Sequence, residues 1–307
     1  MKRIIALSLF AFSCLTSTAH ASSTYAQTKY PIVLAHGMFG WNTIAGVFEY
    51  WYGIPEDLKS NGATVYSTQV SGLASNEARG EQLLTQVQTI LAISGAKKVN
   101  LIGHSQGTMS IRYVAGAIPA QVASVTGIGG PNLGSPVADD LLALNKVSPA
   151  LESVVLTALN GLDSLITTLS GGHFTPNAQA SLTSLSTAGS AAFNASYPQG
   201  IPTTTCGQGA ATVKGVNYYS WGGTGHLTNP LDISDPILGL TGLAFGSTAN
   251  DGLVGQCSSH LGVVLRDNYA FNHLDEVNQL FGLRGLFSAD PVVTIRTQAN
   301  RLKTAGL

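Results

Sequence analysis

The 307-residue chain carries few charges: 15 basic and 16 acidic residues give a formal net charge of −1, and charged residues make up only 10% of the total. Because no cluster of Lys or Arg follows the first few residues, the chain lacks the electrostatic footprint of a nucleic-acid-binding protein, and we expect no nucleic-acid partner. A hydrophobic fraction of 44% excludes a disordered chain and indicates a folded globular protein.

Residues 1–21 have the pattern of a secretory signal peptide. A basic pair at residues 2–3 precedes an apolar run over 4–12, and a small-x-small sequence at 19–21 ends the segment. The apolar run is too short to cross a bilayer as a helix, and we expect no later stretch to be long and apolar enough to replace it. The sequence therefore predicts a mature protein that begins near Ser22, is secreted by way of the periplasm and has no permanent membrane anchor.

Two cysteines, Cys206 and Cys257, remain once Cys14 leaves with the signal peptide. In an oxidising compartment such a pair indicates one disulfide, and the alternative is two unpaired buried thiols. A bond across this spacing would stabilise the fold by roughly 4 kcal/mol in the chain-entropy model. No C-x-x-C spacing is present, so a metal site built on these cysteines is not expected.

Residues 22–307 predict one large α/β domain, since nothing in them resembles a linker. Apolar runs alternate with segments of helical periodicity, which predicts a mostly parallel, doubly wound sheet with helices on both faces and ligands at the carboxyl ends of the strands. The expected strands are 31–35, 64–66, 99–102, 122–128, 216–221 and 261–264, and the expected helices are 77–94, capped by Gly95, then 108–117 and 291–303.

A long stretch from residue 139 to 170 is rich in Leu, Val and Ala, and only Glu152 and Asp163 are charged between residues 148 and 170. One interpretation is a buried core helix. The other is a mobile lid whose apolar face covers an active site in water and meets lipid when it opens. The residues alone leave both interpretations open.

The pentapeptide Gly103-His104-Ser105-Gln106-Gly107 directly follows a predicted strand and precedes a predicted helix. A G-x-S-x-G sequence at such a boundary forms a nucleophile elbow, a strained turn that exposes the serine Oγ above the sheet. The alternative, a surface Gly-Ser loop without chemistry, does not require the strand and helix on either side. We therefore expect a serine hydrolase with Ser105 as the nucleophile.

A serine hydroxyl becomes a useful nucleophile when a histidine removes its proton and a carboxylate orients that histidine. In this fold the acid and then the histidine follow the serine along the chain, which excludes His36 and His104 as the base. The remaining candidates are His173, His226, His260 and His273, with Asp232, Asp235, Asp251, Asp267 and Asp275 as possible acids.

Among these, Asp251 and His273 have the best positions. Asp251 lies in a turn-forming Asn-Asp-Gly sequence, and His273 lies in a polar loop after a predicted strand. His260 adjoins an apolar strand and is expected to be structural. The loop His36-Gly37-Met38 follows the first strand, which nominates the backbone amides of Met38 and Gln106 as the oxyanion hole.

With these pieces assembled, the chain closely resembles the bacterial true lipases of the Pseudomonas type, secreted triacylglycerol lipases that need a dedicated foldase. The segments 30–38, 99–107, 249–254 and 272–279 carry the resemblance, which covers essentially everything after the signal peptide. It implies an α/β-hydrolase fold with a helical lid near residues 148–170. It also places the catalytic triad on Ser105, Asp251 and His273, the oxyanion amides on Met38 and Gln106, and a disulfide between Cys206 and Cys257.

The resemblance alone implies one structural Ca²⁺ ion. Its ligands would be the carboxylates of Asp232 and Asp275 and the backbone carbonyls of Gln279 and Leu283, an all-oxygen set that suits calcium. Without the resemblance, the sequence would indicate that Asp275 is a solvated acidic residue in a loop.

The expected function is therefore hydrolysis of triacylglycerol esters at a lipid–water interface through an acyl-enzyme, with a lipase-specific foldase as a partner during maturation. A carboxylesterase that acts on soluble short-chain esters is the alternative. A catalytically silent binding protein on a hydrolase fold is a third hypothesis, which the presence of all three triad positions disfavours.

Overall fold

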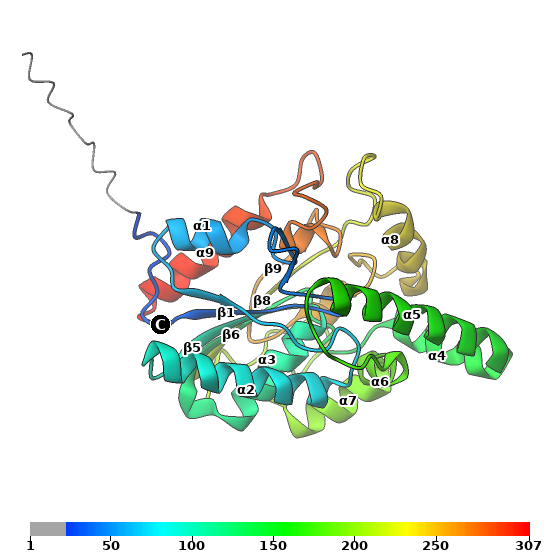
Figure 1. Cartoon of the computed structure of the whole chain (residues 1–307), viewed down its shortest axis with the longest axis horizontal. Coiled ribbons are helices and arrows are strands. Elements are labelled where there is room, and N and C mark those ends of the chain that lie inside the picture. Colours follow the sequence, from blue (N-terminus) through cyan, green and yellow to red (C-terminus); the bar gives the residue numbers. More distant parts are fainter. Residues whose placement is uncertain (1–22) are drawn as a thin grey trace, which may run out of the picture.

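The computed structural model describes residues 23–307, so the expected signal peptide and Cys14 lie outside the described residues. A seven-stranded sheet runs through the centre of the molecule, with helices on both of its faces (Figure 1). This architecture confirms the predicted α/β-hydrolase arrangement. The strands in spatial order are β4 (Val65–Ser67), β1 (Ile32–Ala35), β5 (Val99–His104), β6 (Val122–Ile128), β8 (Val216–Gly223) and β7 (Thr212–Val213), and β9 (Val263–Tyr269) also pairs with β8.

All pairings in this sheet are parallel except that of β7 with β8. A parallel sheet is buried on both faces, which is why β1, β5 and β6 are continuous apolar runs without polar alternation. A separate two-stranded hairpin, β2 (Thr43–Ile44) with β3 (Phe48–Glu49), was not predicted.

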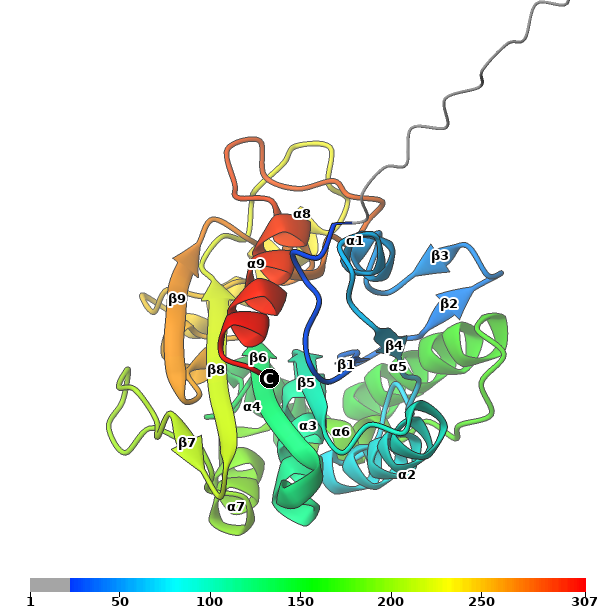
Figure 2. The ribbon, with the colours of Figure 1, turned by 90° about the vertical axis from the view of Figure 1, so that its left-hand side faces the viewer.

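Helices α1 (Ile54–Ser60) and α9 (Pro291–Thr304) cover one face of the sheet, and α2 (Asn76–Ser94) and α3 (Gln106–Ala117) cover the other (Figure 2). Alternate residues of each strand enter two separate cores. Val33 and Leu101 pack on the α2 and α3 side, whereas Ile32 and Ile102 pack on the α1 and α9 side. Packing on both faces holds the strands in place and so fixes where the carboxyl end of each strand lies.

The remaining α-helices are α4 (Pro136–Val147), α5 (Pro149–Leu169), α6 (Ala178–Leu185), α7 (Thr187–Ser196) and α8 (Asp235–Gly242). Of these, α4, α5 and α8 lie beyond the carboxyl ends of the strands, and α6 and α7 lie below them on the side of α2 and α3 (Figure 1). Helix α5 matches the segment 148–170 singled out in the sequence, and Ser148 caps it by accepting a hydrogen bond from the Leu151 amide.

The interpretation of this segment as a buried core helix is wrong, because only 11% of its most apolar 18-residue stretch is buried. The expectation that no stretch after residue 21 is long and apolar enough to cross a bilayer is also wrong. By length and composition, Pro149–Leu169 is long and apolar enough. The helix nevertheless buries a carboxyl group, that of Asp163, against the protein.

The largest difference at the start of a predicted strand is in β9, which starts at Val263, two residues after the predicted start at residue 261. Gly262 adopts a φ of +56°, a left-handed conformation that interrupts the extended backbone. Leu261 therefore stays outside the strand, fully buried, with its amide bonded to Ser220 Oγ.

A disulfide joins Cys206 to Cys257, 51 residues apart, as predicted. It ties the loop before β7 to the loop before β9. We expect the Cys206→Ser/Cys257→Ser double variant to lose about 4 kcal/mol of unfolding free energy, because its unfolded chain regains the entropy of an open loop. Urea unfolding of the oxidised wild type and of the double variant measures the difference, and equal midpoints with equal slopes would contradict it.

Candidate active site

Ser105 lies on a sharp turn between the end of β5 and the start of α3. Its backbone has φ 55° and ψ −130°, a strained conformation for a residue with a side chain. The turn is possible because Gly103 and Gly107 pass so close to neighbouring backbone that a Cβ at either position would overlap it. The Ser105 amide donates to the Ile128 carbonyl at 2.9 Å, which fixes the turn to the end of β6. The strained serine has the geometry of a nucleophile elbow.

Asp251 and His273 lie together, although 22 residues separate them in the sequence. His273 Nδ1 is 2.7 Å from Asp251 Oδ2, and both side chains are buried. The other oxygen of Asp251 accepts hydrogen bonds from the amides of Leu253 and Val254, at 2.9 and 2.7 Å. Because the carboxylate is held by these amides, it can orient the imidazole with Nδ1 protonated and Nε2 free to act as a base.

The His273 ring lies against the ring of His104, the residue before Ser105, with 4.6 Å between ring centroids. The structure thus brings Asp251 and His273 together, next to the residue that precedes Ser105. In residues 23–307 no hydrogen bond joins Ser105 Oγ to His273. In enzymes without substrate this contact is often long and shortens only when the reacting groups are bound.

The other candidate bases lie elsewhere or are already occupied. Both ring nitrogens of His260 are within hydrogen-bond distance of other groups, Nδ1 at 2.9 Å from the Gly207 carbonyl and Nε2 at 3.0 Å from Asp267. This arrangement agrees with the structural role expected for His260. His173 is exposed at the surface, and His226 lies close to Gly242 at the end of α8.

The amides proposed for the oxyanion hole belong to Met38, after β1, and to Gln106, at the N-terminus of α3. The Gln106 side chain is buried and donates to the Ala74 carbonyl at 2.9 Å and to Asn76 at 3.1 Å, which holds the first turn of the helix. Among residues 23–307, neither amide donates a hydrogen bond to another protein group. Both are therefore free to serve a ligand.

A buried arginine that sequence reasoning missed positions the Met38 amide. The guanidinium of Arg79 donates to the carbonyls of His36, at 2.6 Å, and Gly37, at 3.1 Å. It also donates to the carbonyls of Ser71 and Gly72. Because the Gly37 carbonyl and the Met38 amide share one peptide plane, holding the carbonyl sets the direction of the N–H. The available signal was a lone cation within a helix whose other buried residues are mostly apolar.

A second buried network, also missed, lies beneath the elbow. Tyr50 Oη accepts a hydrogen bond from the Gly37 amide at 3.1 Å and lies 2.6 Å from His104 Nδ1. His104 Nε2 lies 3.2 Å from Glu276, whose other oxygen accepts from the Gly223 amide at 2.6 Å. Burial, together with the charge of Asp251, raises the pKa of Glu276 well above its usual range, and burial holds the pKa of His104 well below its own.

The two carboxylates proposed for calcium lie close together. The Asn272 side-chain amide is 3.4 Å from Asp232, and the Asn272 backbone amide donates to Asp275 at 3.2 Å. Asp275 is fully buried, and its Oδ1 has no hydrogen-bond partner in the described residues. Burial, with a contribution from the charge of Asp232, raises the pKa of Asp275 to about 6. A buried carboxylate oxygen without a donor, beside a second carboxylate, is a place that fits a cation.

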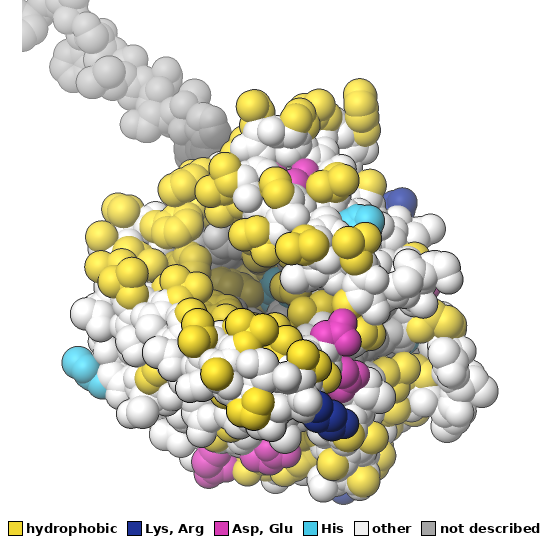
Figure 3. All heavy atoms as spheres, turned by 90° about the vertical axis from the view of Figure 1, so that its right-hand side faces the viewer, with side chains coloured by type: hydrophobic (Ala, Val, Ile, Leu, Met, Phe, Trp, Pro, Cys, Tyr) yellow, Lys and Arg dark blue, Asp and Glu magenta, His cyan; other side chains and the backbone are white. Residues whose placement is uncertain are grey.

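The molecule is hollowed beyond the carboxyl ends of the strands. Figure 3 shows the hollow bordered by hydrophobic side chains, with a histidine visible inside it. Large apolar side chains are exposed on the helices of this region, which include Leu151, Val154, Leu162, Leu165 and Leu169 on α5, and Ile237 and Leu240 on α8. So much exposed apolar surface is characteristic of a surface that meets apolar material.

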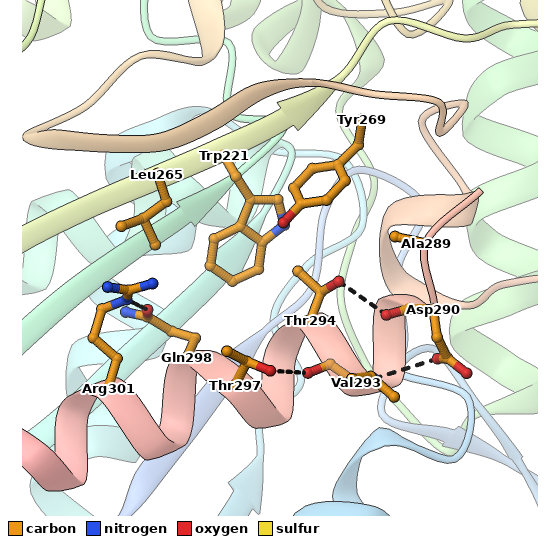
Figure 4. A pocket seen from close by; sticks show the side chains of 10 residues that line it. All are labelled: Trp221, Leu265, Tyr269, Ala289, Asp290, Val293, Thr294, Thr297, Gln298 and Arg301. Carbon is orange, nitrogen blue, oxygen red and sulfur yellow. Dashed lines mark hydrogen bonds between the residues drawn. The ribbon is translucent and has the colours of Figure 1, made fainter.

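A separate cavity of about 200 Å³ lies between α9 and the strands β8 and β9 (Figure 4). Its threonine hydroxyls bond to the backbone of their own helix: Thr294 donates to the Asp290 carbonyl and Thr297 to the Val293 carbonyl. It is lined by none of the triad residues and takes no part in the site described above.

The chain is similar to known triacylglycerol lipases over most of its length. The chain is 54% identical to a triacylglycerol lipase of Vibrio cholerae serotype O1, over 99% of this chain and 98% of that protein. It is 42% identical to triacylglycerol lipases of Burkholderia plantarii and Pseudomonas fragi, over 94% and 92% of this chain and 90% and 98% of those proteins.

Among solved structures, the fold is similar to a Staphylococcus hyicus lipase, with a TM-score of 0.60 and 18% identity over 93% of this chain and 98% of that one. The mature form of a Bacillus licheniformis lipase gives the same TM-score and identity over 90% and 93% of the two chains. At this identity the likeness concerns the fold alone. A family model described as the alpha/beta hydrolase fold matches residues 30–277. The chain therefore belongs to the α/β-hydrolase family and, within it, to the triacylglycerol lipases.

Proposed function

We propose that this protein hydrolyses the carboxylic ester bonds of triacylglycerols, with Ser105, Asp251 and His273 as its catalytic triad. The observation that carries the proposal is the strained Ser105 at the end of β5, directly after His104, whose ring lies against the ring of His273 in the buried Asp251–His273 pair. Near-full-length similarity to triacylglycerol lipases supports the choice of substrate.

The reaction would follow the acyl-enzyme route. His273 Nε2 accepts the proton of Ser105 as its Oγ attacks the ester carbonyl, and it then protonates the departing alcohol. Asp251 keeps the proton of His273 on Nδ1 and stabilises the imidazolium. The amides of Met38 and Gln106 stabilise the oxyanion, each by roughly 3 to 4 kcal/mol if well placed. A water molecule, deprotonated by His273, then releases the fatty acid.

Helix α5 would serve as the lid. It is amphipathic, lies beside the hollow, and leaves five leucine and valine side chains exposed. In water an exposed apolar face of this size is unfavourable, so the helix gains free energy either by turning this face inward over the site or by contact with lipid. A lipid surface would therefore favour the arrangement that admits substrate.

We also propose that Asp232 and Asp275, with the backbone carbonyls of Gln279 and Leu283, hold one structural Ca²⁺ ion. When bound, the ion would neutralise the two buried carboxylates. It would also hold the His273 loop to the Asp232 loop, and so keep the base in place. It would have no role in the chemical steps.

Removal of this ion is expected to lower both the melting temperature and the activity of the wild type. Without it, repulsion between two buried carboxylates is uncompensated. Thermal unfolding and tributyrin hydrolysis with and without EDTA measure the effect, and readdition of Ca²⁺ in excess should restore both. The Asp275→Asn variant should show the lower values already in Ca²⁺ buffer and respond little to EDTA. A variant that loses as much as the wild type would contradict the ligand set.

From the signal-peptide pattern at residues 1–21 we propose secretion through the periplasm without a permanent membrane anchor. A lipase-specific foldase as a maturation partner is proposed from the resemblance to Pseudomonas-type lipases alone. Refolding of denatured protein with and without a lipase-specific foldase tests the partner. Full recovery of activity without any helper would reject it.

The alternative function, hydrolysis of soluble short-chain esters alone, is separated from the proposed one by the physical state of the substrate. We would measure rates on tributyrin and triolein, in Ca²⁺ buffer, across the concentration at which each forms droplets. A sharp rise at droplet formation with activity on triolein supports the proposal. A smooth saturation curve with triolein untouched supports the carboxylesterase and rejects α5 as a lid.

A further inference from the structure

Helix α5 is docked on the protein by a mixed face: Leu156 and Leu159 pack, partly buried, against the cluster of Ala138, Leu182 and Leu185, and the two most buried positions are polar. Its fully or nearly buried positions are Asp163 and Thr167, while Leu162, Leu165 and Leu169 on the same turns are between 48% and 56% exposed. A surface helix of a globular protein ordinarily has the opposite orientation, with its apolar face inward. Polar contacts therefore act beside the packing of Leu156 and Leu159 to keep the helix in this position.

Two of these contacts are ordinary hydrogen bonds near the C-terminal half of the helix. Asn160 Oδ1 accepts from the Ala178 amide at 2.8 Å, and Ser170 Oγ accepts from the Gln69 side chain at 2.8 Å. Asp163 lies between them and is different. Its side chain is fully buried, yet neither carboxyl oxygen has a hydrogen-bond partner among the described residues.

Asp163 rests on Gly72, in the loop between β4 and α2. A side chain at position 72 would overlap Asp163 Oδ1, so the absence of a Cβ there makes the seat for the carboxyl group. The same Gly72 has its carbonyl bonded to the Phe39 amide at 3.0 Å, in the loop that carries Met38. Asp163 of the lid helix therefore packs on Gly72, and Gly72 is hydrogen-bonded to the candidate oxyanion loop.

The charged group that acts on Asp163 is Arg79 of α2, whose guanidinium is already bonded to four backbone carbonyls. No ion pair joins the two side chains within residues 23–307. His36, at the end of β1, is neutral, because burial and the charge of Arg79 lower its pKa to about 3.

The helices packed against α5 bring no further charge to this seat. Helix α6 has no charged residue. Helix α4 carries Lys146 and Asp140, both exposed, and Asp139, which accepts hydrogen bonds from Thr187. Glu152, the other charged residue of α5, accepts a hydrogen bond from Asn145 at the surface.

We propose that the protonation state of Asp163 controls the lid: the neutral carboxyl keeps α5 docked on Gly72 with its apolar face outward, and the ionised carboxylate, which Arg79 and the Leu73 amide compensate only in part, favours release of the helix. The proposal rests on the proposed function of α5 as a lid over Ser105. Its physical basis is that a buried carboxylate without hydrogen-bond donors costs far more free energy than the neutral acid.

The direction of the pH dependence follows from the docked state. Burial raises the pKa of Asp163 to about 6, although the charge of Arg79 and the Leu73 amide oppose the shift. Its ordinary value, about 4, returns when the released helix exposes the group to water. Docking is therefore strongest below pH 4, weakens mainly between pH 4 and pH 6, by up to about a hundredfold in the docking equilibrium, and levels off above that range. Above pH 6 the enzyme should depend more on a lipid surface to stay open.

The first test compares the Asp163→Asn variant, which keeps the size of the side chain but cannot ionise, with the wild type. The substrate is p-nitrophenyl butyrate below its solubility limit, from pH 4 to 9, and the readout is the rate of the variant divided by that of the wild type. Effects of pH on the chemistry that the two enzymes share cancel in this ratio. We expect a ratio near 1 at pH 4 that rises to about fivefold or more at pH 8, because the variant stays docked.

The control is Glu152→Gln, which removes the other charge of the same helix and should leave the ratio flat. A flat ratio for Asp163→Asn, or one that falls with pH, overturns the proposal. Should the variant fold poorly, the wild type alone decides the question. The ratio of its tributyrin rate above droplet formation to that below should grow several-fold from pH 5 to pH 8, and an unchanged ratio rejects the proposal.

These outcomes are distinct from failure of the proposed function. A wild type that does not hydrolyse tributyrin at any pH rejects the function itself. A wild type that hydrolyses tributyrin, with rate ratios that do not respond to pH, rejects only the control by Asp163.

Discussion

The Ser105→Ala variant is expected to hydrolyse tributyrin about 10⁴- to 10⁶-fold more slowly than the wild type. Loss of Oγ removes the atom that forms the acyl-enzyme, so the remaining rate comes from binding and the oxyanion amides alone. The substitution places no new atom in the elbow, where Ser105 has φ 55°. Its melting temperature should therefore stay within a few degrees of the wild-type value.

The matched control is Ser110→Ala, inside helix α3 and five residues after Ser105. Ser110 is also buried, and within residues 23–307 its hydroxyl donates a hydrogen bond only to the Gln106 carbonyl, at 3.5 Å, so most of the activity should remain. Rates are measured by titration of released butyrate in Ca²⁺ buffer. If Ser105→Ala kept more than about a hundredth of the wild-type rate, the serine would not be the nucleophile. The same variant distinguishes an enzyme from a catalytically silent binding protein, because the lipid binding of a binding protein would survive the substitution.

The parallel sheet could be predicted from the sequence because its strands are continuous apolar runs. Strand β6 was predicted with its observed limits, Val122–Ile128, and α2 to within one residue, because Ser75 and Gly95 mark its ends chemically. The short hairpin β2–β3 and the helices α6 to α8 were not predicted. They are short or weakly amphipathic and are held by contacts with distant parts of the chain, which a local pattern does not record.

The residues of the candidate site also fall into those that the sequence predicts and those that it does not. Ser105, Asp251 and His273 could be nominated because a motif and a fixed chain order mark them. Arg79, Tyr50 and Glu276 could not, since their importance comes from what they touch: carbonyls of residues 36 and 37, the Gly37 amide, and His104. Asp163 is a further case. In the sequence it is one of two charges on an apolar helix, and only the structure reveals that its carboxyl is buried without a partner.

The second large expected effect on activity comes from replacing the histidine that acts as the base. His273→Ala is expected to lower the tributyrin rate by about 10⁴-fold or more, because Ser105 then has no base to remove its proton. The Asp251 carboxylate would stay buried and held by the amides of Leu253 and Val254, but it would have no ring to orient. Since the lost interaction is made in the transition state, kcat should fall while KM changes little.

His260→Gln is the comparison that gives this result its meaning, because His260 is the other histidine after the serine that has a carboxylate partner, Asp267 at 3.0 Å. The ring of His260 bridges the Gly207 carbonyl, next to the disulfide, and β9. Its replacement should lower the melting temperature, as expected when a buried bridge is lost, and leave kcat within about tenfold of the wild type. Measured side by side, a large fall in kcat for His260→Gln and a small one for His273→Ala would move the base to His260. The reverse order would establish that the ring held by Asp251 is the one that takes the proton from Ser105.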